Sequence, residues 1–93
     1  MGLLASKQHT EGDTRRWVIK YGRWLDNTAT IEQVDVTSSS ETCTVSNEMI
    51  LGQDIVFLLT GGILGETLMV TVVITDSFEN IKTDTISFHV VPA

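Results

Sequence analysis

The segment over residues 68–75 alternates between a wholly apolar set of side chains and a mixed set that includes two threonines, and this period of two constrains the fold more than any other feature of the chain. The even-numbered positions are entirely apolar, namely Leu68, Val70, Val72 and Ile74. The odd-numbered positions include Thr71 and Thr75. Successive side chains of a β-strand point to opposite faces. The pattern therefore predicts a strand with one side in a core.

A second alternating segment follows near the end of the chain. Its two parities are occupied by Ile86, Phe88 and Val90 and by Thr85, Ser87 and His89. Pro92 would end strand pairing there because proline has no N–H to donate. Residues 77–80 between the two segments are typical of a turn, in which Asn80 is best suited to a left-handed conformation. We expect the two strands to form a hairpin.

Two segments in the middle of the chain also predict strands. Residues 55–59 are a continuous run of apolar side chains, several of them β-branched or aromatic. Residues 42–46 alternate so that Cys43 and Val45 face inward, and the serines at 38–40 indicate a turn before them. The middle of the chain is thus expected to be β-structure.

The segment over residues 30–37 is strand-like but breaks its own alternation. Val34 and Val36 share a parity that Ile31 does not. An extra residue in one strand restores the inward direction of all three side chains. We expect a β-bulge at residues 32–33.

An aromatic segment near the start of the chain has two interpretations. Helical spacing relates its four large side chains, namely Trp17, Tyr21, Trp24 and Leu25. The alternative is a strand that ends at Gly22 and turns Trp17, Ile19 and Tyr21 inward. We favour the strand because the rest of the pattern is β and a lone helix would need its own apolar surface to cover.

Length and composition select among β architectures. A chain of 93 residues has room for one domain, and its single cysteine excludes an internal disulfide framework. Short strands separated by turns predict an all-β fold, a small antiparallel immunoglobulin-like β-sandwich over residues 13–93. Residues 1–12 lack sustained apolar periodicity, so we expect a flexible, extended N-terminal arm there.

The start of the chain and its most apolar stretch are the places where a targeting or membrane signal would lie. Gly2 fits the loose pattern for N-myristoylation, although we favour an unmodified arm. The most apolar stretch, residues 55–74, is interrupted by glycines and polar residues, so no membrane-spanning helix and no membrane partner are expected.

Charge is distributed unevenly along the chain. The first 24 residues contain five cationic side chains and two acids, whereas the remaining residues contain one lysine and ten acids. The formal net charge of -6 argues against nucleic acid as a partner. Lys7, Arg15 and Arg16 are candidates for contact with an acidic surface of the same chain or of a neighbour, with solvated charge as the alternative.

The sequence offers no recognisable catalytic or cofactor site. A thiol nucleophile needs a base beside it, but Cys43 is expected in the core, His9 in the arm and His89 on an outward face. Two separated histidines do not predict a metal site. The acids at predicted turns suit backbone hydrogen bonding, with a calcium site among the loops as the alternative. We expect a protein that is not an enzyme and binds neither cofactor nor metal.

Outward apolar side chains are the better functional candidates. Met69 and Val73 share the outward parity of their strand with two threonines. Trp24 follows Gly22 and Arg23 at a strand end, where core and interface positions are both plausible. An outward apolar patch on neighbouring strands marks a contact surface. We therefore expect Trp24, Met69 and Val73 to contribute to a protein interface.

The chain also resembles a known family over residues 7 to 91. The resemblance is carried by Trp17, Tyr21, Trp24, Leu25 and Ile31, followed by residues 57–67 and 70–77. These features are similar to those of small immunoglobulin-like bacteriophage virion proteins, in particular the fibre-to-tail adaptors. The most specific piece is a strand followed by Gly61, Gly62 and Gly65, where glycines would let the chain pass from one sheet to the other.

The resemblance implies a function and a location. It implies a structural protein of the virion, made in the cytoplasm of the host bacterium, that attaches fibres or joins head and tail components. Implied partners are tail, neck or fibre proteins and further copies of the chain in a symmetric ring. The alternatives are a capsid decoration protein and an immunoglobulin-like surface recognition module.

Overall fold

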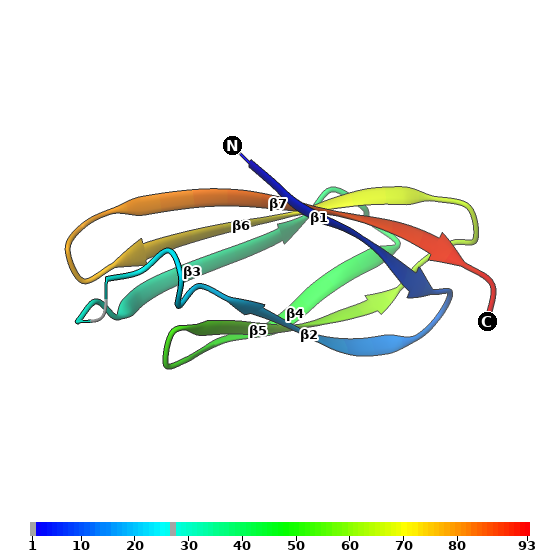
Figure 1. The fold of residues 1–93 in the computed structure, drawn as a ribbon. Coiled ribbons are helices and arrows are strands. Elements are labelled where there is room, and N and C mark those ends of the chain that lie inside the picture. The colour runs from blue at the N-terminus through cyan, green and yellow to red at the C-terminus, as the bar shows by residue number, and fades with distance from the viewer. Residues whose placement is uncertain (1, 27) are drawn as a thin grey trace.

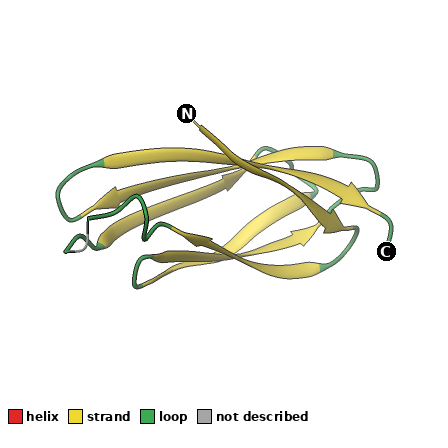
Figure 2. Ribbon diagram, in the orientation of Figure 1, coloured by secondary structure: helices red, strands yellow, loops and turns green. Residues whose placement is uncertain are grey.

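The protein is an all-β sandwich of two sheets (Figure 1, Figure 2). The computed structural model describes residues 2–26 and 28–93. The described residues form seven strands: β1 (Gly2–Thr10), β2 (Thr14–Lys20), β3 (Ile31–Ser38), β4 (Cys43–Leu51), β5 (Asp54–Gly61), β6 (Thr67–Asp76) and β7 (Ile81–Val91). The sheets have the strand orders β1-β7-β6-β3 and β2-β5-β4. Within these residues, no helix is long and apolar enough to cross a membrane.

The core lies between the sheets and follows the period of two that the sequence predicts. The inward side chains of β6 are at most 1% exposed: Leu68, Val70, Val72 and Ile74. The inward side chains of β7 are also buried: Ile86, Phe88 and Val90. The two strands pair antiparallel as the predicted hairpin. Each strand therefore places one apolar parity against the opposite sheet.

The aromatic segment is a strand, followed by a single turn. β2 pairs antiparallel with β5, and Trp17 packs edge-to-face on Phe88 with 5.0 Å between ring centroids. After the strand, the main-chain N–H of Leu25 donates to the carbonyl of Tyr21 at 2.9 Å. The helical spacing in the sequence thus corresponds to one turn that buries Tyr21 and Leu25.

The predicted irregularity of β3 is present. The register of β3 on β6 shifts between Ile31 and Gln33. Ile31 and Val36 are consequently both buried, and the half-buried Val34 packs against the same core. The bulge keeps all three side chains on the inner face.

The turn between β6 and β7 differs from the prediction in one residue. Positive φ falls on Glu79, at 67°, and not on Asn80. The Asp76 carboxylate explains the placement, because it accepts hydrogen bonds from both the main-chain and the side-chain nitrogen of Asn80. Because these two bonds hold Asn80 in place, Glu79 adopts the left-handed conformation that reverses the chain.

The N-terminal segment also differs from the extended arm that the sequence predicts. Gly2–Thr10 form β1, which pairs parallel with β7, while Met1 lies outside the described residues. His9 is fully buried, and its Nε2 lies 3.2 Å from the Asp13 carbonyl and 3.1 Å from the Gly61 carbonyl. Backbone pairing and these bonds do not require apolar side chains, which is why periodicity did not predict the strand. The pairing does not test whether residues 1–12 can move independently of residues 13–93, so the boundary at residue 12 stays a prediction.

The sheet arrangement is compatible with an immunoglobulin-like sandwich. Such a sandwich groups its third, sixth and seventh strands in one sheet and its second, fourth and fifth in the other. The same grouping occurs here, with β1 beside β7. β1 and β2 are therefore edge strands of different sheets, and they follow one another in the chain.

Candidate protein contact surfaces

The β5 strand is apolar on both of its faces. Ile55, Phe57 and Leu59 point into the core and are fully buried. Val56 and Leu58 have the opposite parity and lie on the outer face of the β2-β5-β4 sheet. A strand that is apolar on both sides is typical of one that is covered on both sides. The outer face of this sheet is thus a candidate contact surface.

Neighbouring strands extend this surface. The register places Val18 of β2 and Met49 of β4 on either side of Val56. Val56 is only 4% exposed, whereas Val18 is 44% and Met49 49% exposed. Together with the outward Leu51 and Leu58, these residues form what we call the apolar sheet face: Val18, Met49, Leu51, Val56 and Leu58. Several exposed apolar side chains in adjoining rows are typical of an interface.

A bulge in β4 directs Met49 and Leu51 to this face. The register of β4 on β5 shifts between Ser46 and Met49, and Asn47 has a positive φ of 52°. Val45 before the shift and Ile50 after it both pack against the core, although their parities differ. Bulges are a common means of redirecting side chains. Without the extra residue, Met49 would have the inward parity of Val45.

The outer face of the other sheet carries the predicted interface residues Met69 and Val73. Met69 is 41% exposed, and its partner across β7 is Ser87. Val73 is half-buried between Asp35 of β3 and Thr83 of β7. Both side chains lie on the outer face, but each has polar neighbours. They do not form a continuous apolar patch, so we call this surface the threonine face.

The predicted cationic residues lie along β1 and β2. Lys7 of β1 is opposite Phe88 in the register, and Arg16 of β2 is opposite Leu58. The Arg15 guanidinium carbon lies 4.9 Å from the centroid of the Trp17 ring, within cation–π range. The structure thus brings Lys7, Arg15 and Arg16 to one side of the sandwich.

Trp24 lies after β2, in the turn that Tyr21 begins. It is 40% exposed, and the Lys82 ammonium is 5.6 Å from its ring centroid. Lys82 also forms a 3.2 Å ion pair with the buried Asp84, which accepts a 3.1 Å hydrogen bond from the Tyr21 hydroxyl. Burial, followed by the charge and hydrogen bond of Asp84, raises the pKa of Tyr21 far above its ordinary value. These contacts connect the turn that follows β2 with strand β7 of the other sheet.

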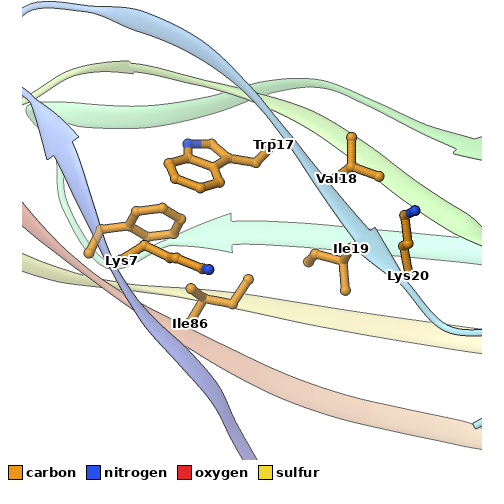
Figure 3. A pocket seen from close by; sticks show the side chains of 7 residues that line it. Lys7, Trp17, Val18, Ile19, Lys20 and Ile86 are labelled. Carbon is orange, nitrogen blue, oxygen red and sulfur yellow. The ribbon is translucent and has the colours of Figure 1, made fainter. Parts of the chain in front are cut away.

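A groove opens between β1 and β2 (Figure 3). Its volume is about 180 Å³, and its lining combines apolar side chains with two lysines: Lys7, Trp17, Val18, Ile19, Lys20, Ile86 and Phe88. Trp17, which packs edge-to-face on Phe88, lies at one end of the groove, and Ile19 and Ile86 face each other across it (Figure 3). Composition gave no signal for this groove, because it depends on how β1 and β2 lie relative to each other.

The glycine segment joins β5 to β6 and thereby the two sheets. Gly61, Gly62 and Gly65 have φ values of 95°, 109° and 88°, which disfavour other residues. A Cβ on Gly61 would lie 2.5 Å from the Thr42 carbonyl oxygen. The three glycines therefore permit a close passage of the chain from one sheet to the other.

Glu66 stabilises the same passage. Its carboxylate accepts hydrogen bonds from the Ile63 N–H at 2.9 Å, the Thr42 hydroxyl at 2.8 Å and the Ser40 hydroxyl at 2.9 Å. The bond from Ile63, followed by that from Thr42, lowers the pKa of Glu66. One carboxylate thus joins the β5–β6 connection to the β3–β4 connection.

The thiol and the imidazoles occupy structural positions. Cys43 is buried, and burial raises the pKa of its thiol, with a further contribution from the charge of Glu66. A nucleophilic cysteine needs the opposite shift. His89 is on the outward side of β7, with Nδ1 3.1 Å from the Thr67 hydroxyl. Among the residues that the structure describes, no group of three or more His, Cys, Asp or Glu side chains could hold a metal ion.

The apolar sheet face is the functional candidate that the sequence analysis did not identify. The signal was the run at residues 55–59, which is apolar at every position. Because this run does not alternate, it indicates a strand but does not by itself separate an inner face from an outer one. Its two outward side chains, Val56 and Leu58, predict a second covered face.

Comparison with known proteins identifies the family. The chain has no match among curated proteins. The family model described as podophage GP4 fibre-tail adaptor protein gp77 matches residues 9–89, most of the chain and all of β2–β6. The match confirms the resemblance on which the functional prediction rests. The chain therefore belongs to the podophage GP4 fibre-tail adaptor family gp77 and is a structural component of the phage virion.

Proposed function

We propose that the protein is a non-enzymatic adaptor whose copies form a symmetric ring at the phage tail and attach fibres or join head and tail components. It is made in the cytoplasm of the host bacterium and acts through protein–protein contacts, without nucleic acid or membrane. The observation that carries this proposal is the apolar sheet face. Its central row, Val18, Val56 and Met49, crosses all three strands of the sheet.

Charge complementarity suggests what covers this face in the ring. Arg16 is exposed beside the apolar residues on β2. The side formed by β3, β4 and their connection is acidic, with the exposed residues Glu32, Asp35, Glu41 and Glu48. We infer that the acidic side of one copy contacts the apolar sheet face of the next. Such a head-to-tail contact joins different surfaces and closes into a ring when the rotation permits.

The two alternative functions use the same surfaces differently. A capsid decoration protein would place the apolar sheet face on the shell instead of on a neighbouring copy. A recognition module would bind its target through the loops at one end of the sandwich and would not need the face covered. The exposed apolar rows favour the two assembled forms, because an uncovered apolar surface promotes nonspecific association.

Copy number in purified particles distinguishes these functions. Quantitative mass spectrometry would compare this chain with the major shell protein in the same digest. A low copy number in a fixed ratio, as expected for one ring, would support the adaptor. A ratio near one to the shell protein would support a decoration protein, and absence from the particles would support the recognition module.

A further inference from the structure

The groove between β1 and β2 combines an apolar interior with two free strand edges. β1 and β2 are the edge strands of their respective sheets. The interior is formed by Trp17, Ile19, Ile86 and Phe88, and its volume of about 180 Å³ accommodates an apolar side chain. An apolar interior between two edges suits an extended polypeptide, which can present a side chain inward while its backbone pairs with an edge.

The backbone of β2 is oriented for such pairing. The Tyr21 N–H donates to the Gln53 carbonyl, and the Asp13 carbonyl accepts from the Gly61 N–H. In an antiparallel ladder, every second residue of a strand directs its backbone N–H and carbonyl to the same neighbouring strand. The odd-numbered residues of β2 therefore form backbone hydrogen bonds with β5. The N–H and carbonyl groups of Arg16, Val18 and Lys20 therefore point to the free edge. Val18 and Lys20 line the groove.

Charge around the groove is mainly positive. Lys7 and Lys20 line it, and Lys7 extends along its interior (Figure 3). Arg16 lies on the same strand as Lys20, and the carboxylate of Asp54 is the acid opposite Lys20 in the register. Both charged side chains that line the groove are lysines, which favours a ligand with negative side chains.

We propose that the free edge of β2 binds an extended acidic segment of another virion protein as an added strand, with one apolar side chain of that segment in the groove. The backbone groups of Arg16, Val18 and Lys20 would supply the pairing, and Lys7 and Lys20 would contact carboxylates on either side of the inserted side chain.

A separate polypeptide fits this groove better than a second copy of the chain. The acidic strands β3 and β4 pack against each other on the opposite side of the sandwich. Their inward side chains already fill their own core, as Val36 and Cys43 illustrate. The apolar side chains that β4 leaves exposed, Met49 and Leu51, belong to the apolar sheet face, which we assign to a different contact.

Synthetic peptides test the proposal on the isolated full-length chain. The probe is the acetylated and amidated peptide Thr-Asp-Thr-Leu-Thr-Asp-Thr. One control peptide replaces leucine with serine, a second replaces both aspartates with lysines, and a third carries N-methyl groups that block strand pairing on one edge. A Trp24→Phe variant leaves Trp17 as the only tryptophan, so its fluorescence reports on the groove.

The proposal predicts saturable binding that changes Trp17 fluorescence and weakens with added salt. All three control peptides should bind much more weakly. Lys7→Glu and Lys20→Glu should each weaken binding by roughly fivefold, because each replaces an attraction with a repulsion. Arg23→Glu makes the same change of charge outside the groove and should leave binding unaffected. Lys7 lies in β1, so Lys7→Glu could weaken binding by disturbing the pairing of β1 with β7. Lys20 lies in β2, so Lys20→Glu tests the charge of the groove without changing β1.

Three results would overturn the proposal. The first is no change of Trp17 fluorescence at millimolar peptide. The second is equal weakening by Arg23→Glu or equal binding of the serine peptide, since either would mean attraction by diffuse charge. The third is a change in Trp17 fluorescence with increasing concentration of the chain alone, which would make a second copy the occupant. The peptide titrations use a chain concentration at which sedimentation finds a monomer, so contacts between copies in a ring do not contribute to them.

Discussion

The two sheets share one inner pattern but have different outer faces. Both place alternate apolar side chains in the core, as Val72 of β6 and Phe57 of β5 illustrate. On the outside, β6 carries Thr71 and Thr75, whereas β5 carries Val56 and Leu58. Threonine combines β-propensity with a hydroxyl group that water can solvate. This difference supports our proposal that a partner covers the apolar sheet face, whereas the threonine face is solvated.

The largest expected effect comes from the passage between the sheets. Gly61→Ala places a Cβ against the Thr42 carbonyl in a residue with φ of 95°, and should destabilise the fold by at least about 2 kcal/mol. Gly65→Ala is the matched control, because its φ is 88° but no atom lies within 4 Å of the added Cβ. It should cost about 1 kcal/mol. Urea unfolding of both variants measures the difference, and equal losses would contradict a steric role for Gly61.

A second contact between the sheets should have a similar or slightly smaller effect. Tyr21→Phe removes the buried hydrogen bond to Asp84 while keeping the ring, and should cost about 1.5 to 2 kcal/mol, as for a bond to a charged group. Thermal unfolding at neutral pH measures it. Thr71→Val changes one hydroxyl on the threonine face and is the control. A larger effect of the control would contradict the importance given to the Tyr21–Asp84 contact.

The outer faces themselves can be compared through their methionines. Met49→Thr makes the apolar sheet face resemble the threonine face, and should weaken contact between copies by about 1 kcal/mol, roughly fivefold in affinity. Met69→Thr changes the same residue type on the threonine face and should have little effect. Sedimentation of the two variants over a range of concentrations measures self-association. Greater weakening by the Met69 variant would reverse the assignment of the faces.

The smallest expected effect is in acid, where two hydrogen-bonded carboxylates become protonated. Hydrogen bonds from Ile63 and Thr42 lower the pKa of Glu66, which joins the two sheets. For Asp76, burial alone would raise the pKa, but hydrogen bonds from Asn80 and Phe78 outweigh it, so the pKa is lowered. Both groups therefore stabilise the fold fully above their unfolded pKa, near 4, and lose this contribution as pH falls through the folded pKa.

Melting temperatures between pH 6 and pH 2 test this dependence. The native chain should lose stability on the acid side of this range, and Glu66→Gln and Asp76→Asn should each show a shallower loss. A variant whose melting temperature fell as steeply as that of the native chain would show that the corresponding carboxylate has no such role.

Side-chain patterns predicted much of the fold. The alternation around Val70 and Phe88 predicted the hairpin, and the parity break at Ile31 predicted the bulge in β3. These predictions succeeded because strand periodicity records which side of a strand is buried. The strand β1 was missed because its pairing with β7 depends on the backbone and on buried contacts such as those of His9.

Surfaces were harder to predict than strands. Met69 and Val73 have the outward parity that the sequence indicates, but their polar neighbours belong to β3 and β7 and are known only from the register. The apolar sheet face likewise requires the pairing of Val18 and Met49 with Val56. A bulge at Asn47, which has no apolar signature, directs Met49 outward. Contact surfaces depend on register, which one strand's pattern does not determine.

Oxidation of the two methionines tests the central distinction most directly. Met49 and Met69 are about equally exposed in the isolated chain, at 49% and 41%, so peroxide should oxidise both to the sulfoxide at similar rates. The same treatment of purified phage particles, followed by mass spectrometry, should find Met49 protected and Met69 still reactive. Protection of Met69 with Met49 still reactive, or no protection of either, would contradict the assignment of the apolar sheet face as the covered surface.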